Sequence, residues 1–71
     1  MSRDIVARFG RRIRQIRQAR NLNQTVFAER VGTDQSTISL IENGKQEPRL
    51  RFIESLAGGL KTTLGELFKD L

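Results

Sequence analysis

The chain contains no cysteine and no histidine among its 71 residues. Without cysteine it can form neither a disulfide nor a thiolate metal site. Without histidine it lacks the commonest general base and the commonest transition-metal ligand. It also has no glycine-rich nucleotide loop and no loop of clustered carboxylates that would hold a metal. We therefore expect no enzyme active site, no metal and no cofactor.

Long apolar runs are also missing. No apolar stretch approaches the roughly 18 residues that a membrane-spanning helix needs, and the first ten residues, MSRDIVARFG, carry no signal-peptide core. A chain of this length has room for one domain. We expect residues 1–71 to form a single domain that is soluble and intracellular.

Positive charge, by contrast, is abundant. Lys and Arg number 13 against 8 Asp and Glu, which gives a net charge of +5, and ten of the positive residues are arginine. The planar guanidinium group can donate two parallel hydrogen bonds to a phosphate. This balance favours a polyanion such as nucleic acid as the partner. The alternative is a well-solvated surface whose charge keeps the chain in solution.

Apolar residues recur at helical spacings and nowhere alternate as they would in a strand. We predict an all-α fold with helices at residues 3–19, 24–31, 35–43 and 49–60 and a fifth helix after Thr63. The candidate N-caps are Ser2, Asn23, Asp34 and Thr63. The predicted inward-facing residues of the first and fourth helices are Ile5, Phe9, Ile13, Ile16, Leu50, Ile53, Leu56, Ala57 and Leu60. Gly58 and Gly59 are expected to let another helix approach closely.

Two short helices joined through Gly32 predict a helix-turn-helix at about residues 24–43. In its second helix, Ile38 and Ile41 mark the buried side. The side chains on the outward and flanking arc are Ser36, Ser39, Leu40 and Asn43. Serine and asparagine can bond base edges, and a leucine tip can meet a thymine methyl group. The alternative for Leu40 is a single surface leucine, which is common in proteins.

Glu42 follows Ile38 by four residues and so lies on the inward edge of its helix. A carboxylate there needs a partner. Arg17 follows Ile13 by four residues and reaches the edge of the first helix's apolar stripe. We predict an Arg17–Glu42 ion pair; the alternative is a solvated glutamate without a fixed partner.

An ordered set of short motifs spans most of the chain. It reads Ile16-Arg17, Leu22-Asn23-Gln24, Phe27-Ala28, Gly32, Gln35-Ser36-Thr37, Ile38-Ser39 and Ile41-Glu42-Asn43-Gly44-Lys45. In this order and spacing, the segment Ile13–Pro48 resembles the phage-repressor/Cro-type (XRE-like) helix-turn-helix family. The resemblance implies a compact five-helix, lambda-repressor-like domain that binds operator DNA, usually as a symmetric dimer.

The resemblance also implies roles for individual residues. The positions that correspond to DNA contacts are Gln24, Gln35, Ser36, Thr37, Ser39, Leu40, Asn43 and Lys45. Gln24 takes the position that contacts a phosphate and sometimes braces Gln35, and Arg17 and Glu42 match the family's structural ion pair. Leu40 stands where a polar or basic residue is frequent, and this difference shifts the expected base preference towards A/T contacts. Lys61 stands where glycine often ends the fourth helix.

The leading interpretation is a dimeric repressor or autoregulator that reads an inverted-repeat operator in the major groove, in a bacterial cytoplasm and with no membrane contact. The candidate dimer contacts are Phe52, Phe68 and Leu71; the alternative is that Phe68 and Leu71 close the core. A second interpretation is an antitoxin that masks a toxin protein and also binds its own operator. A third, weaker one is a membrane-active cationic helix at residues 3–20.

Overall fold

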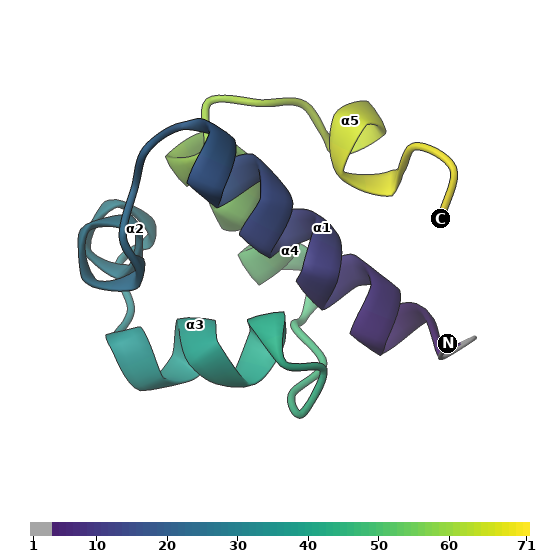
Figure 1. Ribbon diagram of the computed structural model, residues 1–71, viewed down its shortest axis with the longest axis horizontal. Coiled ribbons are helices and arrows are strands. Elements are labelled where there is room, and N and C mark those ends of the chain that lie inside the picture. The colour runs from purple at the N-terminus through teal and green to yellow at the C-terminus, as the bar shows by residue number, and fades with distance from the viewer. Residues whose placement is uncertain (1–3) are drawn as a thin grey trace.

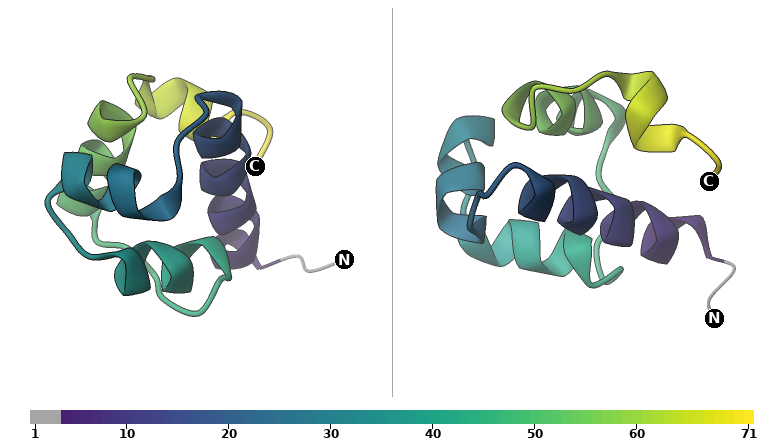
Figure 2. Two further views of the ribbon diagram at one scale, coloured as in Figure 1. Left: turned by 60° about the vertical axis from the view of Figure 1, so that its left-hand side comes forward. Right: turned by 45° about the horizontal axis from the view of Figure 1, so that its top comes forward.

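The computed structural model describes residues 4–71 as five α-helices without a strand (Figure 1). Their bounds are Ile5–Ala19 (α1), Gln24–Val31 (α2), Gln35–Glu42 (α3), Leu50–Gly59 (α4) and Leu64–Phe68 (α5). In all three views α3 and α5 lie at opposite sides of the molecule (Figures 1 and 2). The predicted all-α fold is confirmed.

Helix starts are set by side chains that accept hydrogen bonds from free backbone N–H groups. Asn23, Asp34 and Thr63 cap α2, α3 and α5 as predicted. The predicted cap Ser2 lies outside the described residues. Instead, the carboxylate of Asp4 accepts from the backbone N–H of Val6 at 3.1 Å. Because the backbone of Asp4 is extended (φ −67°, ψ 125°), α1 begins later than the pattern predicted.

Residues in the left-handed backbone conformation follow the helices, as the ends of α2 and α4 illustrate. Gly32 has a φ of 87° at the end of α2, which glycine adopts without steric cost. Lys61 has a φ of 53° after α4, and the next N–H, of Thr62, donates to the carbonyl of Ala57 at 3.0 Å. Lysine therefore ends α4 in the conformation that a glycine would adopt, at a steric cost of about 1 kcal/mol.

The core is formed by the inner faces of all five helices. Its buried apolar residues are Phe9, Ile13, Phe27, Ala28, Ile38, Ile41, Leu56, Ala57, Leu60 and Leu67. Two predictions of an inward position were wrong: Ile5 is 50% exposed and Leu50 is 78% exposed. Each is the first residue of its helix, where neighbouring helices surround the side chain less completely than they do in the middle.

Arginines in α1 and just after it hold the carboxy-terminal part of the chain. The guanidinium of Arg12 donates to the carbonyl of Glu66 at 2.7 Å and to that of Lys69 at 2.6 Å. Arg20 Nε donates to the carbonyl of Leu60 at 2.8 Å. These carbonyls lie in or just after the last turns of α4 and α5, where they lack helical partners and where a positive charge is favoured.

Two close helix contacts depend on glycine. A Cβ at Gly10 would collide with the carbonyl oxygen of Ile41 and lie 2.9 Å from that of Glu42, so α1 meets the backbone of α3. A Cβ at Gly59 would lie 2.8 Å from Val31 Cγ2 of α2. The predicted close approach is confirmed for Gly59 and wrong for Gly58, which has nothing within 4 Å.

Alanine substitutions at Gly10 and Gly58 should have opposite effects. Gly10→Ala should lower the free energy of unfolding by about 1–3 kcal/mol, because overpacking pushes α1 away from α3. Gly58→Ala should raise it by about 0.5–1 kcal/mol, because alanine loses less backbone entropy in a helix. Urea titrations of both variants test this. A Gly10→Ala protein as stable as the parent would show that α1 and α3 are not in backbone contact.

Candidate nucleic-acid interface

The helix-turn-helix consists of α2, a turn at residues 32–34 and α3. The turn is tight because the backbone N–H groups of Gly32 and Thr33 both donate to the carbonyl of Ala28 at 2.9 Å. At the start of α3, Asp34 accepts from the N–H of Thr37 at 2.7 Å. This hydrogen bond is the main cause of a lowered pKa for Asp34.

The outward face of α3 carries the residues that the sequence predicted. Ile38 and Ile41 are fully buried, which turns the opposite side of the helix to solvent. The exposed residues there are Gln35, Ser36, Leu40 and Asn43, and Thr37 and Ser39 are half-buried. Lys45 follows in an exposed loop. These six residues of α3 and its C-cap therefore form one mostly polar surface, with Lys45 at its end.

A buried ion pair joins α1 to the end of α3. Arg17 Nε donates to Glu42 Oε2 at 2.6 Å and Arg17 Nη2 donates to Glu42 Oε1 at 2.9 Å. Arg17 is 8% exposed and Glu42 is 2% exposed. The third guanidinium nitrogen, Nη1, donates to the carbonyl of Leu22 before α2 at 2.8 Å. The predicted contact is thus present, and it also holds the loop that leads into the helix-turn-helix.

The environment of Glu42 keeps its carboxylate charged. Burial alone raises the pKa of Glu42, but the hydrogen bonds from Arg17 and Gln24, the positive charge of Arg17 and the contact with Arg14 outweigh burial. Its pKa therefore lies below the ordinary value of 4.5. Glu42 is ionised at neutral pH and acts only as a hydrogen-bond acceptor.

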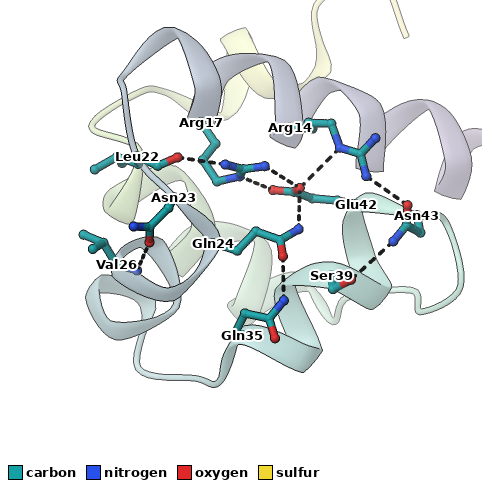
Figure 3. Close-up of polar contacts among 10 residues, drawn as sticks. All are labelled: Arg14, Arg17, Leu22, Asn23, Gln24, Val26, Gln35, Ser39, Glu42 and Asn43. Carbon is teal, nitrogen blue, oxygen red and sulfur yellow. Dashed lines mark hydrogen bonds and ion pairs between the residues drawn. The ribbon is translucent and has the colours of Figure 1, made fainter.

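One chain of hydrogen bonds runs from Glu42 to the head of α3 (Figure 3). Gln24 Nε2 donates to Glu42 Oε1 at 3.0 Å, and Gln35 Nε2 donates to Gln24 Oε1 at 2.6 Å. Since Glu42 can only accept, Gln24 must turn its amide nitrogen inward and its oxygen towards Gln35. Gln35 is left with an outward oxygen and one outward N–H, the pair that bonds the major-groove edge of adenine.

A second chain runs from Glu42 to the tail of α3 (Figure 3). Arg14 Nε lies 3.4 Å from Glu42 Oε1, and Arg14 Nη2 donates to Asn43 Oδ1 at 2.9 Å. Asn43 Nδ2 in turn donates to Ser39 Oγ at 3.3 Å. The sequence analysis did not single out Arg14. Its position three residues before Arg17, on the same helix face, was the available signal.

The three candidate dimer residues differ in exposure. Phe52 and Leu71 are half-buried and pack against the core. Phe68 is 38% exposed and stacks on Phe9 with ring centroids 5.2 Å apart. Phe68 also lines an apolar hollow of about 170 Å³ together with Ile5, Val6, Phe9, Glu47, Pro48 and Ile53, which neither Phe52 nor Leu71 reaches.

Residues 4–71 present neither a metal cluster nor a membrane-spanning helix. That part of the chain holds no group of three or more His, Cys, Asp or Glu residues placed to bind a metal ion. None of its helices combines the length and the apolar character needed to cross a membrane.

Comparisons with known proteins agree with this geometry. The model of the helix-turn-helix family HTH_3 matches residues 13–67. The control protein C.MunI of Mycoplasma sp. is 39% identical over 69 residues, which cover 96% of this chain and 93% of that protein. The cryptic phage CTXphi transcriptional repressor RstR of Vibrio cholerae is 36% identical over 62 residues, 87% of this chain but only 56% of the repressor.

A solved structure is also similar. The restriction-modification controller protein C.AhdI from Aeromonas hydrophila superposes with a TM-score of 0.87 at 35% sequence identity. The match covers 89% of this chain and 91% of that one. The agreement therefore extends over nearly the full length of both folds.

Removing Arg17 should destabilise the fold in a pH-dependent way. At pH 7, Arg17→Ala should lower the free energy of unfolding by about 3 kcal/mol, because it leaves a buried carboxylate without its main partner. The pKa of Glu42 is lower in the folded than in the unfolded state, so this stabilisation is present above about pH 4.5 and is lost as the pH falls through the folded value. The difference between parent and variant should therefore shrink in acid.

Arg11→Ala serves as the matched control, because Arg11 is exposed on the same helix and its side chain donates no hydrogen bond within residues 4–71. Its effect should stay within about 0.5 kcal/mol. Urea titrations between about pH 3 and pH 7 measure the free energies of unfolding of both variants. Equal losses for the two variants at neutral pH would remove the ion pair from the supports of the fold.

Proposed function

The chain belongs to the helix-turn-helix family HTH_3, a family of DNA-binding regulators rather than enzymes, and we propose that it is a dimeric repressor or autoregulator of the controller type. The observation that carries this proposal is the outward face of α3. Three of its polar residues, Gln35, Ser39 and Asn43, are held by two hydrogen-bond chains that start at a buried ion pair. A surface so held has little conformational freedom to lose on binding.

The recognition step places α3 in the major groove of operator DNA. Gln35 pairs with adenine through its outward oxygen and N–H. Ser36 and Ser39 offer hydroxyl groups to base edges. Leu40, 40% exposed, contacts a thymine methyl group. These contacts supply sequence preference.

Phosphate contacts supply affinity and position. Asn43 and Lys45 lie at the end of α3 and in the loop after it, and Gln24 stands at the start of α2. Positive charge near the phosphates releases counterions, so binding should weaken steeply as the salt concentration rises. The net charge of +5 acts in the same direction.

Molecular size supports a dimer. The chain measures 29 × 23 × 23 Å, whereas successive major grooves on one face of DNA lie about 34–36 Å apart. One copy can therefore read one groove, and two copies related by a two-fold axis read an inverted repeat. Among the three candidate contacts, Phe68 is the most exposed and borders the apolar hollow, so we place it in the interface. Phe52 and Leu71 are half-buried against the core and are the weaker candidates.

The names of the similar proteins indicate the kind of regulation. One is a control protein, one is a restriction-modification controller protein and one is a transcriptional repressor. We infer by analogy that this chain controls a small operon in the bacterial cytoplasm and that its own gene is among the targets. A toxin-masking role would become the better explanation if no DNA sequence were selected.

Selection from a random duplex pool at physiological salt tests the DNA-binding role. The parent should enrich an inverted repeat whose half-site centres lie about 10 base pairs apart. Leu40→Ala should bind the selected site about 1–3 kcal/mol more weakly and lose preference at one or two base pairs. Binding without any enriched sequence would contradict the proposal. An equal loss on all sequences would show that Leu40 is not a base reader.

A charge at Phe68 should separate the dimer. Phe68→Glu should sediment as a monomer and bind a single half-site as the parent does at high dilution, because the carboxylate cannot be buried between two copies without a partner. Leu64→Glu is the control, since Leu64 is 43% exposed on the same helix and lies outside the hollow. Circular dichroism checks folding. A Phe68→Glu protein that remains dimeric would move the interface elsewhere.

A further inference from the structure

We propose that Arg14 is a specificity-determining positioning residue, which keeps one hydrogen-bond donor of Ser39 and one of Asn43 free to face DNA. The inference rests on the proposed function, because it concerns how α3 reads its operator. Arg14 itself lies on α1 and touches the recognition surface through one hydrogen bond to Asn43 (Figure 3).

The argument starts from the guanidinium group, which has five N–H donors and no acceptor. The amide of Asn43 can turn either its oxygen or its nitrogen towards a neighbour. Beside Arg14 Nη2, at 2.9 Å, only the oxygen is acceptable. The nitrogen of Asn43 must therefore point the other way, and it donates to Ser39 Oγ at 3.3 Å.

The direction of the Ser39 hydroxyl follows. Its oxygen accepts from Asn43, so its own proton is available for another acceptor. A serine inside a helix often donates to the carbonyl four residues earlier, as Ser55 does to the carbonyl of Arg51 at 3.3 Å. Ser39 makes no such bond, and its proton has no acceptor within residues 4–71. It is free to donate outward.

Asn43 is constrained in the same sense. Its oxygen is held by Arg14 and one N–H by Ser39, which leaves one N–H for a partner outside the protein. Phosphate oxygens are acceptors, so Asn43 matches the DNA backbone. One donor-only group thus leaves a free N–H on Asn43 and a free O–H on Ser39 at the interface.

This arrangement predicts which bases Ser39 favours. In the major groove guanine offers N7 and O6, thymine offers O4 and adenine offers N7 as acceptors, whereas cytosine offers its N4 amino group as a donor. A hydroxyl whose proton is free can donate to guanine, thymine or adenine, whereas a hydroxyl that donates its proton to Asn43 has only lone pairs left, which suit cytosine. With Arg14 in place, Ser39 should therefore favour a base that offers an acceptor over cytosine.

The test starts from the operator half-site that the parent protein selects. Each base pair of the half-site is replaced in turn by the other three, and binding is measured for the parent, Arg14→Ala and Arg11→Ala. Arg14→Ala should reduce discrimination against cytosine at one position by about fivefold, the factor that one ordinary hydrogen bond supplies. Arg11→Ala removes the same charge from the same helix and should leave all base preferences unchanged.

A second variant covers the case in which Arg14→Ala does not fold. In Asn43→Asp, the carboxylate cannot donate, so the Ser39 hydroxyl turns its proton inward and offers lone pairs to the DNA. Affinity should fall on every sequence because of charge repulsion, but at the Ser39 position cytosine should rise in rank. Melting curves check that the variants are folded.

The outcomes separate the two proposals. A parent that selects no sequence would overturn the DNA-reading function itself. A parent that selects an operator, with base preferences that both Arg14→Ala and Asn43→Asp leave unchanged, would overturn only the role of Arg14.

Discussion

The buried carboxylate of Glu42 is the interaction on which the rest of the structure depends. It receives donors from Arg14 and Arg17 of α1 and from Gln24 of α2, and it is itself the last residue of α3. Burying a charge is costly, and an ion pair of this kind adds less stability than its short distances suggest. Its larger effect is geometric, because three helices can satisfy one carboxylate only in one mutual arrangement.

The sequence predicted the elements that depend on local chemistry. Asn23, Asp34 and Thr63 were identifiable as caps because a cap acts within three residues, and the ion pair was identifiable because four-residue spacing from buried isoleucines placed both partners on inward edges. The sequence pattern did not show the distances between helices. The periodicity of α1 and α4 does not show where neighbouring helices end, which is why Ile5 and Leu50 were misplaced, and the need for Gly10 arises only from the crossing with α3.

Arginine content overstated the charge available for DNA. Arg12 and Arg17 of α1, and Arg20 just after it, donate to carbonyl groups or to Glu42 and act as internal supports. A net charge is compatible with nucleic-acid binding but does not distinguish these supports from free cations. The site itself could be recognised from motif spacing, whereas the directions of its hydrogen bonds needed the contacts of Arg14 and Gln24.

The face of α3 that we propose reads the operator contains both tethered and untethered positions. Gln35, Ser39 and Asn43 are tied through side chains to the buried pair, whereas the side chains of Ser36 and Leu40 form no hydrogen bond within the described part of the chain. Replacing an untethered side chain leaves the packing and the hydrogen-bond chains intact. New operator preferences can therefore arise, in evolution or in a designed library, through changes at these two positions while the scaffold stays the same.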